Sequence, residues 1–189
     1  MSIVLASGSP RRLELLKLIG IEEFKVIPDL AAECITPGLS PKKQVIALSF
    51  QKASNIARLC EKHDVIIAAD TIVYLDNEPL GKPESQIDAI HMLEKLSGHM
   101  HSVYTGVTII KDDKHVSAVE KTDVYFKDLT DVEIKNYVET GEPMDKAGSY
   151  AAQGRAAVFI KRIDGDFYNV IGLPLYRLSI MLKEFGELL

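Results

Sequence analysis

The sequence predicts an α/β protein with a mixed sheet and flanking helices. Segments whose apolar residues recur at helical spacing alternate along the chain with short apolar runs that are typical of buried strands. Two strand-like runs, over about 100–111 and 115–126, flank Asp112-Asp113 and predict a β-hairpin. Because a hairpin is antiparallel, whereas strands joined through helices are usually parallel, we expect both kinds of pairing.

Proline and glycine bound the first elements. A short apolar strand over 3–6 leads to Pro10, which suits the first turn of a helix, and Gly20 ends that helix. The apolar run 24–27 predicts a second strand, and 28–39 is a predicted loop.

The next predicted helix starts at Ser40-Pro41 and runs to about residue 62. Lys52 falls in the middle of its apolar stripe. A lysine there either extends its charge to the rim of the apolar surface or points toward a fixed anion. At helical spacing, the stripe consists of Val45, Leu48, Ile56 and Leu59.

Turn and capping residues mark the elements of the rest of the chain. Thr130-Asp131-Val132-Glu133 is a capping box, which predicts the start of a helix, and Gly141 ends it. Leu173-Pro174 predicts the start of a final helix. The other expected elements are a strand over 65–75, a turn at Asp76-Asn77, a helix over about 85–96, a polar loop over 145–154 and a strand over about 157–162.

Composition and charge narrow the class of protein. The 189 residues are 47% apolar and 26% charged, as in ordinary globular proteins, and we expect a single domain over 1–189. A net charge of −5 argues against a nucleic-acid-binding protein, and no apolar run approaches the roughly 20 residues that cross a membrane. Cys34 and Cys60 lack CxxC spacing, and the first residues lack the basic segment of a signal peptide. We therefore expect a cytoplasmic protein with reduced thiols.

The junction after the first strand, Ser7-Gly8-Ser9-Pro10-Arg11-Arg12, has the composition of an anion site. Small residues let the backbone approach a ligand, and the amides of a helix N-terminus favour an anion. Arg11 and Arg12 oppose the helix dipole, so a negative group is expected to compensate them. Phosphate is the natural candidate, because guanidinium groups bind its oxygens in pairs. The alternative is an ordinary strand-to-helix turn with two solvated arginines.

Asp70 interrupts an otherwise apolar strand. A buried, ionised carboxylate is costly unless it is paired, hydrogen-bonded or bound to a metal. Asp70 is therefore either the partner of a buried lysine or arginine, a residue that closes a strand, or a catalytic carboxylate at a strand end, where α/β sheets usually place their sites.

Further cations lie in two glycine-containing loops. Lys82 stands between Gly81 and Pro83, and Lys146 lies in the loop 145–154. His99 and His101 lack a third metal ligand and are expected at the surface, and no GxxxxGK[ST] phosphate loop is present. Together, these cations and carboxylates have the composition of a site for a polyphosphate with a divalent metal. The cations are Arg11, Arg12, Lys52, Lys82 and Lys146, and the carboxylates are Glu33 and Asp70.

Six blocks of the sequence resemble the Maf family, the so-called septum formation proteins, and they occur in the order of that family. Spread over nearly the whole chain, they are 5–12 (LASGSPRR), 69–73 (ADTIV), 81–83 (GKP), 103–107 (VYTGV), 145–150 (DKAGSY) and 170–175 (VIGLPL).

This resemblance implies a fold, an activity and a site. Maf proteins are nucleoside triphosphate pyrophosphatases that cut between the α- and β-phosphates, and their mixed α/β fold has two lobes around a cleft, similar to the inosine triphosphate pyrophosphatases. The resemblance implies that Asp70 is the catalytic proton acceptor, that Glu33 is a further pocket position, and that Mg²⁺, Mn²⁺ or Co²⁺ is the cofactor. We expect Glu33 and Asp70 to hold the metal, directly or through water. The family analogy alone suggests a homodimer. The positions that match contacts to the nucleoside triphosphate are Ser7, Arg11, Arg12, Lys52 and Lys82.

Three places in the sequence distinguish the branches of the family. The branch that acts on dTTP and UTP carries two arginines after the proline, a threonine after the catalytic aspartate and a late glutamine. The branch that acts on 7-methyl-GTP tends to have Trp-Arg, Asp-Gln and a serine-glutamate pair there. Arg11-Arg12, Thr71 and Gln153 favour the first branch, so we expect a dTTP/UTP pyrophosphatase that also takes CTP or modified pyrimidine nucleotides. The alternatives are a house-cleaning enzyme for modified nucleotides and a nucleotide-binding regulator of cell division.

Overall fold

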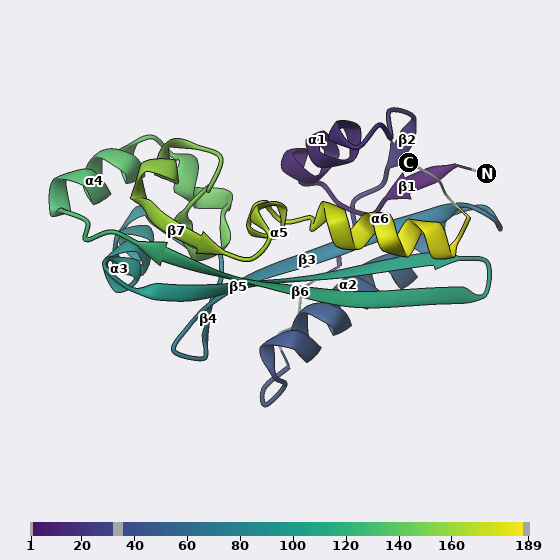
Figure 1. The fold of residues 1–189 in the computed structure, drawn as a ribbon, viewed down its shortest axis with the longest axis horizontal. Helices are drawn as coiled ribbons and strands as arrows, with labels where there is room; N and C mark the ends of the chain where they lie inside the picture. The colour runs from purple at the N-terminus through teal and green to yellow at the C-terminus, as the bar shows by residue number, and fades with distance from the viewer. Residues whose placement is uncertain (1, 32–35, 187–189) are drawn as a thin grey trace. The chain divides into compact units, whose positions relative to one another are not determined.

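The computed structural model describes residues 2–31 and 36–186 and is drawn as a ribbon in Figure 1. Its strands are β1 (Ile3–Leu5), β2 (Phe24–Val26), β3 (Val65–Leu75), β4 (Glu78–Leu80), β5 (Met100–Lys111), β6 (Lys114–Phe126) and β7 (Ile160–Asp164). Its α-helices are α1 (Pro10–Leu18), α2 (Pro41–Ala57), α3 (Gln86–Leu96), α4 (Asp131–Glu139), α5 (Phe167–Ile171) and α6 (Leu175–Glu184). The short 3-10 helices are η1 (Glu142–Asp145), η2 (Ala147–Ser149) and η3 (Arg155–Phe159).

The described strands form a mixed seven-stranded sheet in the order β2-β1-β3-β5-β6-β7, with β4 paired to β3 beside this path. β1 runs parallel to both β2 and β3, because a helix returns the chain before each new strand. β4 pairs antiparallel with β3, and β7 pairs antiparallel with β6. β5 and β6 are neighbours joined by the turn at Asp112-Asp113, as predicted. The α/β fold with a mixed sheet and flanking helices is therefore confirmed.

Proline, glycine and capping residues determine where the helices begin and end. Pro10 occupies the first turn of α1, and Gly20, with a φ of 86°, follows the end of this helix. At the start of α4, the Thr130 hydroxyl accepts a hydrogen bond from the Glu133 N–H, and the Glu133 carboxylate accepts one from the Thr130 N–H at 2.9 Å. This is the predicted capping box, and it satisfies amides that have no partner within the helix.

The chain divides into two compact units, each with its own apolar core. The first unit comprises residues 1–70, 105–120 and 172–189, and the second comprises residues 71–104 and 121–171.

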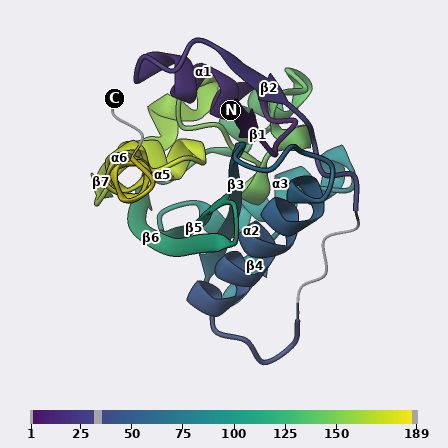
Figure 2. The ribbon, with the colours of Figure 1, turned by 90° about the vertical axis from the view of Figure 1, so that its right-hand side faces the viewer.

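In the first unit, α2 and α6 lie on opposite sides of the strand segments (Figures 1 and 2). On the α2 side, a Cβ at Gly106 of β5 would lie 2.2 Å from the carbonyl oxygen of Val45, so only glycine allows this close approach. On the α6 side, Arg177 Nε donates to Glu120 Oε2 of β6 at 3.1 Å. The core between β1, β3 and α2 consists of Val4, Ala6, Ala53, Ile56, Ile66 and Ala68.

In the second unit, α3 packs against α4 (Figure 1), and aromatic rings fill the core. Phe126 contacts the rings of Tyr150 and Phe159 with centroid separations of 4.9 Å and 6.2 Å. Tyr137 of α4 meets Phe159 nearly edge-on at 5.2 Å. These contacts join β6, α4 and the 3-10 segments in one core.

The structure corrects several expectations about the elements. α2 ends at Ala57 rather than near residue 62, so Leu59, which we expected in its apolar stripe, is 71% exposed. β7 begins at Ile160, later than expected, because residues 155–159 form η3. β4 and α5 are too short for apolar periodicity to reveal them, and the sequence pattern predicts neither. Among the described residues, no helix has both the length and the apolar character needed to cross a membrane.

Candidate functional site

Lys52 and Asp70, the two charges that the sequence places among apolar residues, meet in the first unit. Lys52 Nζ of α2 donates to Asp70 Oδ1 of β3 at 2.6 Å, and the two side chains are 13% and 5% exposed. Lys52 lies one helical turn from the buried Leu48 and Ile56 of α2, so it projects from the face of this helix that packs against the sheet. Of the two interpretations of Lys52, the structure therefore shows the one with a fixed anion.

One carboxylate oxygen of Asp70 is left for other contacts. Asp70 Oδ2 is buried and accepts no hydrogen bond from any residue within 2–31 or 36–186. A buried acceptor without a donor costs about 1–3 kcal/mol, so it calls for a further partner. Asp70 also lies inside β3, which continues to Leu75, and the expectation that it stands at a strand end is wrong. The ion pair explains how the strand tolerates the charge, and Oδ2 keeps lone pairs that no described residue engages.

Ser7 and Arg12 connect the first sequence block with the last one. Arg12 Nη1 donates to Ser7 Oγ at 3.1 Å, and Arg12 Nε donates to the carbonyl oxygen of Gly172 at 2.8 Å. The Ser9 N–H also donates to Ser7 Oγ, at 3.2 Å. Ser7 Oγ thus accepts two hydrogen bonds, and its own proton can be donated to a ligand oxygen.

Gly172 provides a contact to Arg12 that the sequence pattern does not reveal. Its carbonyl holds the Arg12 guanidinium from 160 residues away, and a backbone acceptor leaves no trace in side-chain patterns. The signal that could have found it is the block 170–175, which resembles the family but has no charged or nucleophilic side chain. Arg11 stands half-buried beside Arg12 in the first turn of α1, and that turn contains no acidic residue.

Three of the sequence blocks meet around Gly148 in the second unit. The Gly148 N–H donates to the carbonyl oxygen of Gly81 at 3.0 Å, which joins the blocks 145–150 and 81–83. A Cβ at Gly148 would lie 3.1 Å from the methyl groups of Val73, and its φ is 67°. The left-handed backbone therefore favours glycine here, and the tight space beside Val73 adds to this preference.

The other predicted contact residues of the second unit differ in exposure. Lys82 and Gln153 are exposed, whereas Thr71 is half-buried. Lys146 forms an ion pair with its neighbour Asp145. The contacts of these residues with a substrate stay a prediction.

The metal site also stays a prediction. Glu33 lies outside the described residues. Within residues 2–31 and 36–186, no group of three or more His, Cys, Asp or Glu side chains gathers as a metal site. The buried Oδ2 of Asp70 nevertheless has the ligand chemistry that hard divalent cations prefer. Asp70 therefore fits a cation that takes its further ligands from outside the described residues, from phosphate oxygens and from water.

His101 is a core residue, and the expectation that it lies at the surface is wrong. Its side chain is 1% exposed within the aromatic cluster, and its Nε2 lies 2.8 Å from the hydroxyl oxygen of Tyr150. Burial lowers the pKa of His101 from 6.5 to about 4, although the nearby Asp123 charge acts in the opposite direction. Burial likewise raises the pKa of the Tyr150 hydroxyl. His101 is therefore neutral near pH 7.

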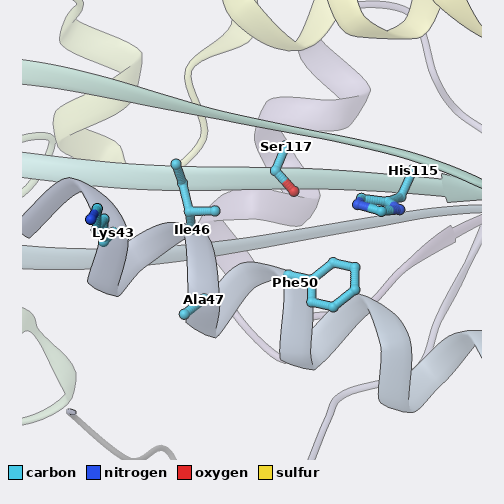
Figure 3. A pocket seen from close by; sticks show the side chains of 6 residues that line it. All are labelled: Lys43, Ile46, Ala47, Phe50, His115 and Ser117. Carbon is cyan, nitrogen blue, oxygen red and sulfur yellow. The ribbon is translucent and has the colours of Figure 1, made fainter. Parts of the chain in front are cut away.

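A separate hollow of about 470 Å³ lies between α2 and β6 in the first unit (Figure 3). Ser49 donates to the Ile46 carbonyl at 3.0 Å and so accepts from Thr108 at 2.9 Å, and Thr108 accepts from Ser117 at 2.8 Å. Ser117 therefore offers this hollow an acceptor rather than a donor. None of the predicted site residues is among its described lining residues, which are Lys43, Ile46, Ala47, Phe50, His115 and Ser117.

Comparison with known sequences gives matches over almost the whole chain. The family described as "Maf-like protein" matches residues 2–185. A protein named dTTP/UTP pyrophosphatase from Caldicellulosiruptor bescii is 49% identical over 189 residues, covering 97% of this chain and 94% of the relative. A protein of the same name from Bacillus cereus (strain AH820) is 48% identical over 184 residues, covering 97% of this chain and 95% of the relative.

Among solved structures, that of a HAM1 protein from Coxiella burnetii resembles this chain with a TM-score of 0.54, covering 96% of this chain and 98% of that one. At 17% identity, this likeness concerns the fold alone. Because the family match spans residues 2–185 and relatives are nearly half identical over 97% of the chain, this chain belongs to the Maf-like protein family, as its sequence blocks predict.

Proposed function

We propose that this chain is a nucleoside triphosphate pyrophosphatase that hydrolyses dTTP and UTP to the nucleoside monophosphate and pyrophosphate. Relatives named dTTP/UTP pyrophosphatase, 49% and 48% identical over 97% of the chain, support this activity. Arg11-Arg12, Thr71 and Gln153 match the pattern of the branch that acts on these nucleotides.

The main observation in support of this proposal is that the two oxygens of the Asp70 carboxylate have different surroundings. Lys52 Nζ holds Oδ1 at 2.6 Å, while the buried Oδ2 has no donor among the described residues. In the proposed reaction, a water oxygen attacks the α-phosphorus and a proton of that water passes to Asp70 Oδ2. The bond from the α-phosphorus to the bridging oxygen breaks, and pyrophosphate leaves with its electron pair. A carboxylate that is paired at one oxygen and has no donor at the other can accept this proton.

The cations of the chain bind the triphosphate in this proposal. Ser7 and Arg12 lie at the turn between β1 and α1, where the Ser7 proton is available to a phosphate oxygen. Arg11 is adjacent, and Lys82 matches a further substrate contact of the family that the sequence resembles. These groups neutralise the charge that develops on the leaving pyrophosphate, so most of the catalysis is electrostatic.

Glu33 and Asp70 hold the divalent cation, which we propose is Mg²⁺, Mn²⁺ or Co²⁺. When bound, the metal supplies a positive charge that polarises the phosphate oxygens. Asp70 would hold it, directly or through water, with Oδ2 as the available oxygen because Oδ1 already pairs with Lys52.

Release of pyrophosphate across a nucleotide panel tests the proposed function. We expect the highest kcat/KM with dTTP and UTP, compared with CTP, 5-methyl-UTP and ITP, and loss of turnover without Mg²⁺. A higher kcat/KM with modified nucleotides would favour a house-cleaning role. Tight nucleotide binding with little turnover would favour a regulator of cell division and overturn the enzymatic proposal.

The proposal includes a cytoplasmic location and a homodimer, and the family analogy supports the homodimer. Light scattering of the purified chain tests the dimer, and a single species with the mass of one 20.9 kDa chain would contradict it.

A further inference from the structure

Residues 114–120 of β6, in the first unit, form an edge of the sheet, which we call the β6 edge. In the strand order, β6 lies between β5 and β7, but β7 pairs with β6 only over residues 123–126. Within residues 2–31 and 36–186, no strand therefore pairs with the side of 114–120 that faces away from β5. Lys114 and His115 are exposed, the other residues of the β6 edge are half-buried, and none is buried.

The hairpin register decides which backbone groups of β6 point toward β5. The two-residue turn at 112–113 pairs Lys111 with Lys114, and residues that flank such a turn exchange both of their backbone hydrogen bonds. Further along the hairpin, in the same register, the Phe126 N–H donates to the His99 carbonyl at 3.1 Å. Even-numbered residues of β6 therefore direct their backbone groups toward β5.

The backbone groups of the odd-numbered residues point away from β5. At the end of β6, the Lys127 N–H accordingly donates to the Phe159 carbonyl at 2.9 Å, on the side away from β5. In the β6 edge, the outward N–H and C=O groups belong to His115, Ser117 and Val119. Edge strands are commonly protected by proline, by bulges or by central charges, and the β6 edge has no proline and carries its Lys and Glu only at its two ends. It is therefore suited to pair with a further strand.

The charges at the two ends make the β6 edge complementary to itself. Two copies related by a twofold axis run antiparallel, and their outward groups meet when Ser117 lies opposite the partner's Ser117. Lys114 then lies opposite the partner's Glu120, and Glu120 opposite the partner's Lys114. Both side chains lie on the side of the sheet where Arg177 of α6 donates to Glu120 Oε2 at 3.1 Å. Opposite charges placed directly across two strands stabilise the pairing.

The neighbouring registers lack this complementarity. A twofold axis at Val116 would place Glu120 opposite the partner's Asp112, which brings like charges together. An axis at Ala118 would leave both ends of the β6 edge without an opposite charge across from them. The charges therefore select the register that is centred on Ser117.

The hollow between α2 and β6 adds an apolar contact on the other side of the strand. His115 and Ser117 line this hollow (Figure 3). Phe50 of α2 is 38% exposed, and its ring centroid lies 4.9 Å from that of His115. In the register centred on Ser117, the partner's Val119 lies opposite His115 on this same side. A second copy thus brings an apolar side chain next to the exposed Phe50 ring.

We propose that this chain forms a homodimer in which the β6 edge pairs antiparallel with the β6 edge of a second copy, with Ser117 opposite the partner's Ser117. The inference rests on the homodimer of the proposed function and names its interface. Pairing continues the sheet across the twofold axis and supplies partners to the outward backbone groups of both copies. The two pairs of Lys114 with Glu120 fix the register.

Disulfide cross-linking tests the register directly. Val116 lies opposite the partner's Ala118 as a non-hydrogen-bonded pair, with Cα atoms about 4.5 Å apart, within the range of about 4.4–6.8 Å that a disulfide spans. Cys34 and Cys60 are first replaced by serine, so that no other thiol reacts. We expect co-expressed Val116→Cys and Ala118→Cys chains to form a cross-linked dimer on mild oxidation with copper phenanthroline. Neither variant alone should form one.

Each other cross-linking result would overturn the proposal in its own way. A product from Val116→Cys alone would show an axis at Val116, and a product from Ala118→Cys alone would show an axis at Ala118. If the protein scatters light as a dimer but no combination gives a product, the interface lies elsewhere. That result would overturn this inference and leave the homodimer of the proposed function standing.

The dissociation constant of the dimer, measured by analytical ultracentrifugation, tests the backbone pairing. Val119→Pro removes an outward N–H but no hydrogen bond to β5, so we expect the dissociation constant to rise at least about 100-fold. Val119→Ala keeps the N–H and should raise it less than about tenfold. An unchanged dissociation constant in Val119→Pro would overturn the proposal. Urea unfolding shows whether this variant folds, and if it does not, the cross-links and the charge variant described next decide.

Lys114→Glu tests the charge pairing without changing the backbone. It places like charges opposite each other at both ends of the interface, so we expect the dissociation constant to rise about tenfold. Lys17→Glu, the same change at an exposed position of α1, is the matched control and should leave it unchanged. Equal effects of the two variants would contradict the register.

The interface and the enzymatic activity fail separately. None of these measurements uses a nucleotide, so a protein that releases no pyrophosphate would overturn the proposed activity, while the cross-links would still decide the interface. A wild-type chain that stays monomeric would overturn this inference together with the homodimer, while leaving the pyrophosphatase activity to its own test.

Discussion

Lys52 Nζ and Asp70 Oδ1 lie 2.6 Å apart and join α2 to β3 inside the first unit. The ion pair leaves Asp70 Oδ2 buried without a donor among the described residues. The pair therefore has two roles. Its structural role is to neutralise a charge in an apolar strand, and its chemical role is to leave one basic oxygen of Asp70 without a donor.

Asp70→Asn tests the chemical task. Asparagine keeps the shape but removes the charge and the basic oxygen, so we expect kcat to fall by about two to four orders of magnitude in a pyrophosphate-release assay. Asp64→Asn is the matched control, since Asp64 is 2% exposed and accepts from the Ser2 N–H at 2.7 Å. This control should lose stability but keep kcat, and parental activity in Asp70→Asn would show that another group accepts the proton.

Lys52→Met tests the structural task. Removal of one partner leaves an uncompensated buried charge, which lowers the free energy of unfolding by about 3 kcal/mol. In the Lys52→Met/Asp70→Asn double variant no charge is left unpaired, so urea denaturation should show partial recovery. Lys42→Met, an exposed change on the same helix, should shift stability by less than about 0.5 kcal/mol. A double variant no more stable than Lys52→Met would contradict the pairing.

His101 should make the stability of the second unit depend on pH. Its pKa falls from 6.5 to about 4 on folding because of burial, so between these values the unfolded chain binds the proton and the folded one does not. The contribution is fully present above pH 6.5 and is lost as the pH falls toward 4. We expect a loss of about 2 kcal/mol between pH 7 and pH 4.5 that is absent in His101→Gln.

Chemical denaturation at both pH values measures this difference. His91→Gln, which changes an exposed histidine on α3, should keep the pH dependence of the parent. An identical pH dependence in His101→Gln and the parent would show that other groups cause it.

Gly106→Ala tests the approach of α2 to β5. An added Cβ would lie 2.2 Å from the Val45 carbonyl oxygen and 2.4 Å from its carbon, so the helix must move away from the strand. We expect a loss of about 1–3 kcal/mol in thermal or urea unfolding. Gly81→Ala meets no atom within 4 Å and should be nearly neutral. Equal stability of the two variants would contradict the close packing.

Local signals explain the parts of the fold that could be predicted. The Pro10 and Gly20 boundaries of α1, the Thr130–Glu133 capping box and the hairpin turn each depend on hydrogen bonds or backbone angles within a few residues. The apolar face of the last helix follows from the helical spacing of its apolar residues, and the structure buries Leu175, Leu178, Met181 and Leu182.

The sequence predicts the structure less well where an element is stabilised by contacts between residues that are distant in the sequence. Apolar residues continue at helical spacing beyond the end of α2. Their spacing therefore predicts neither the end of this helix at Ala57 nor the exposure of Leu59. The burial of His101 depends on Phe126 and Tyr150, whose rings reach it from other elements.

The sequence by itself determined the fold class, the family and which charges are out of place, because local periodicity and ordered motifs are properties of the chain. Only the tertiary structure decided the partners of those charges, which are Asp70 for Lys52 and the Gly172 carbonyl for Arg12. The physical reason is that a buried polar group must be satisfied by whichever donor or acceptor the folded backbone brings within about 3 Å, and strand pairing and helix packing, not sequence distance, set that choice.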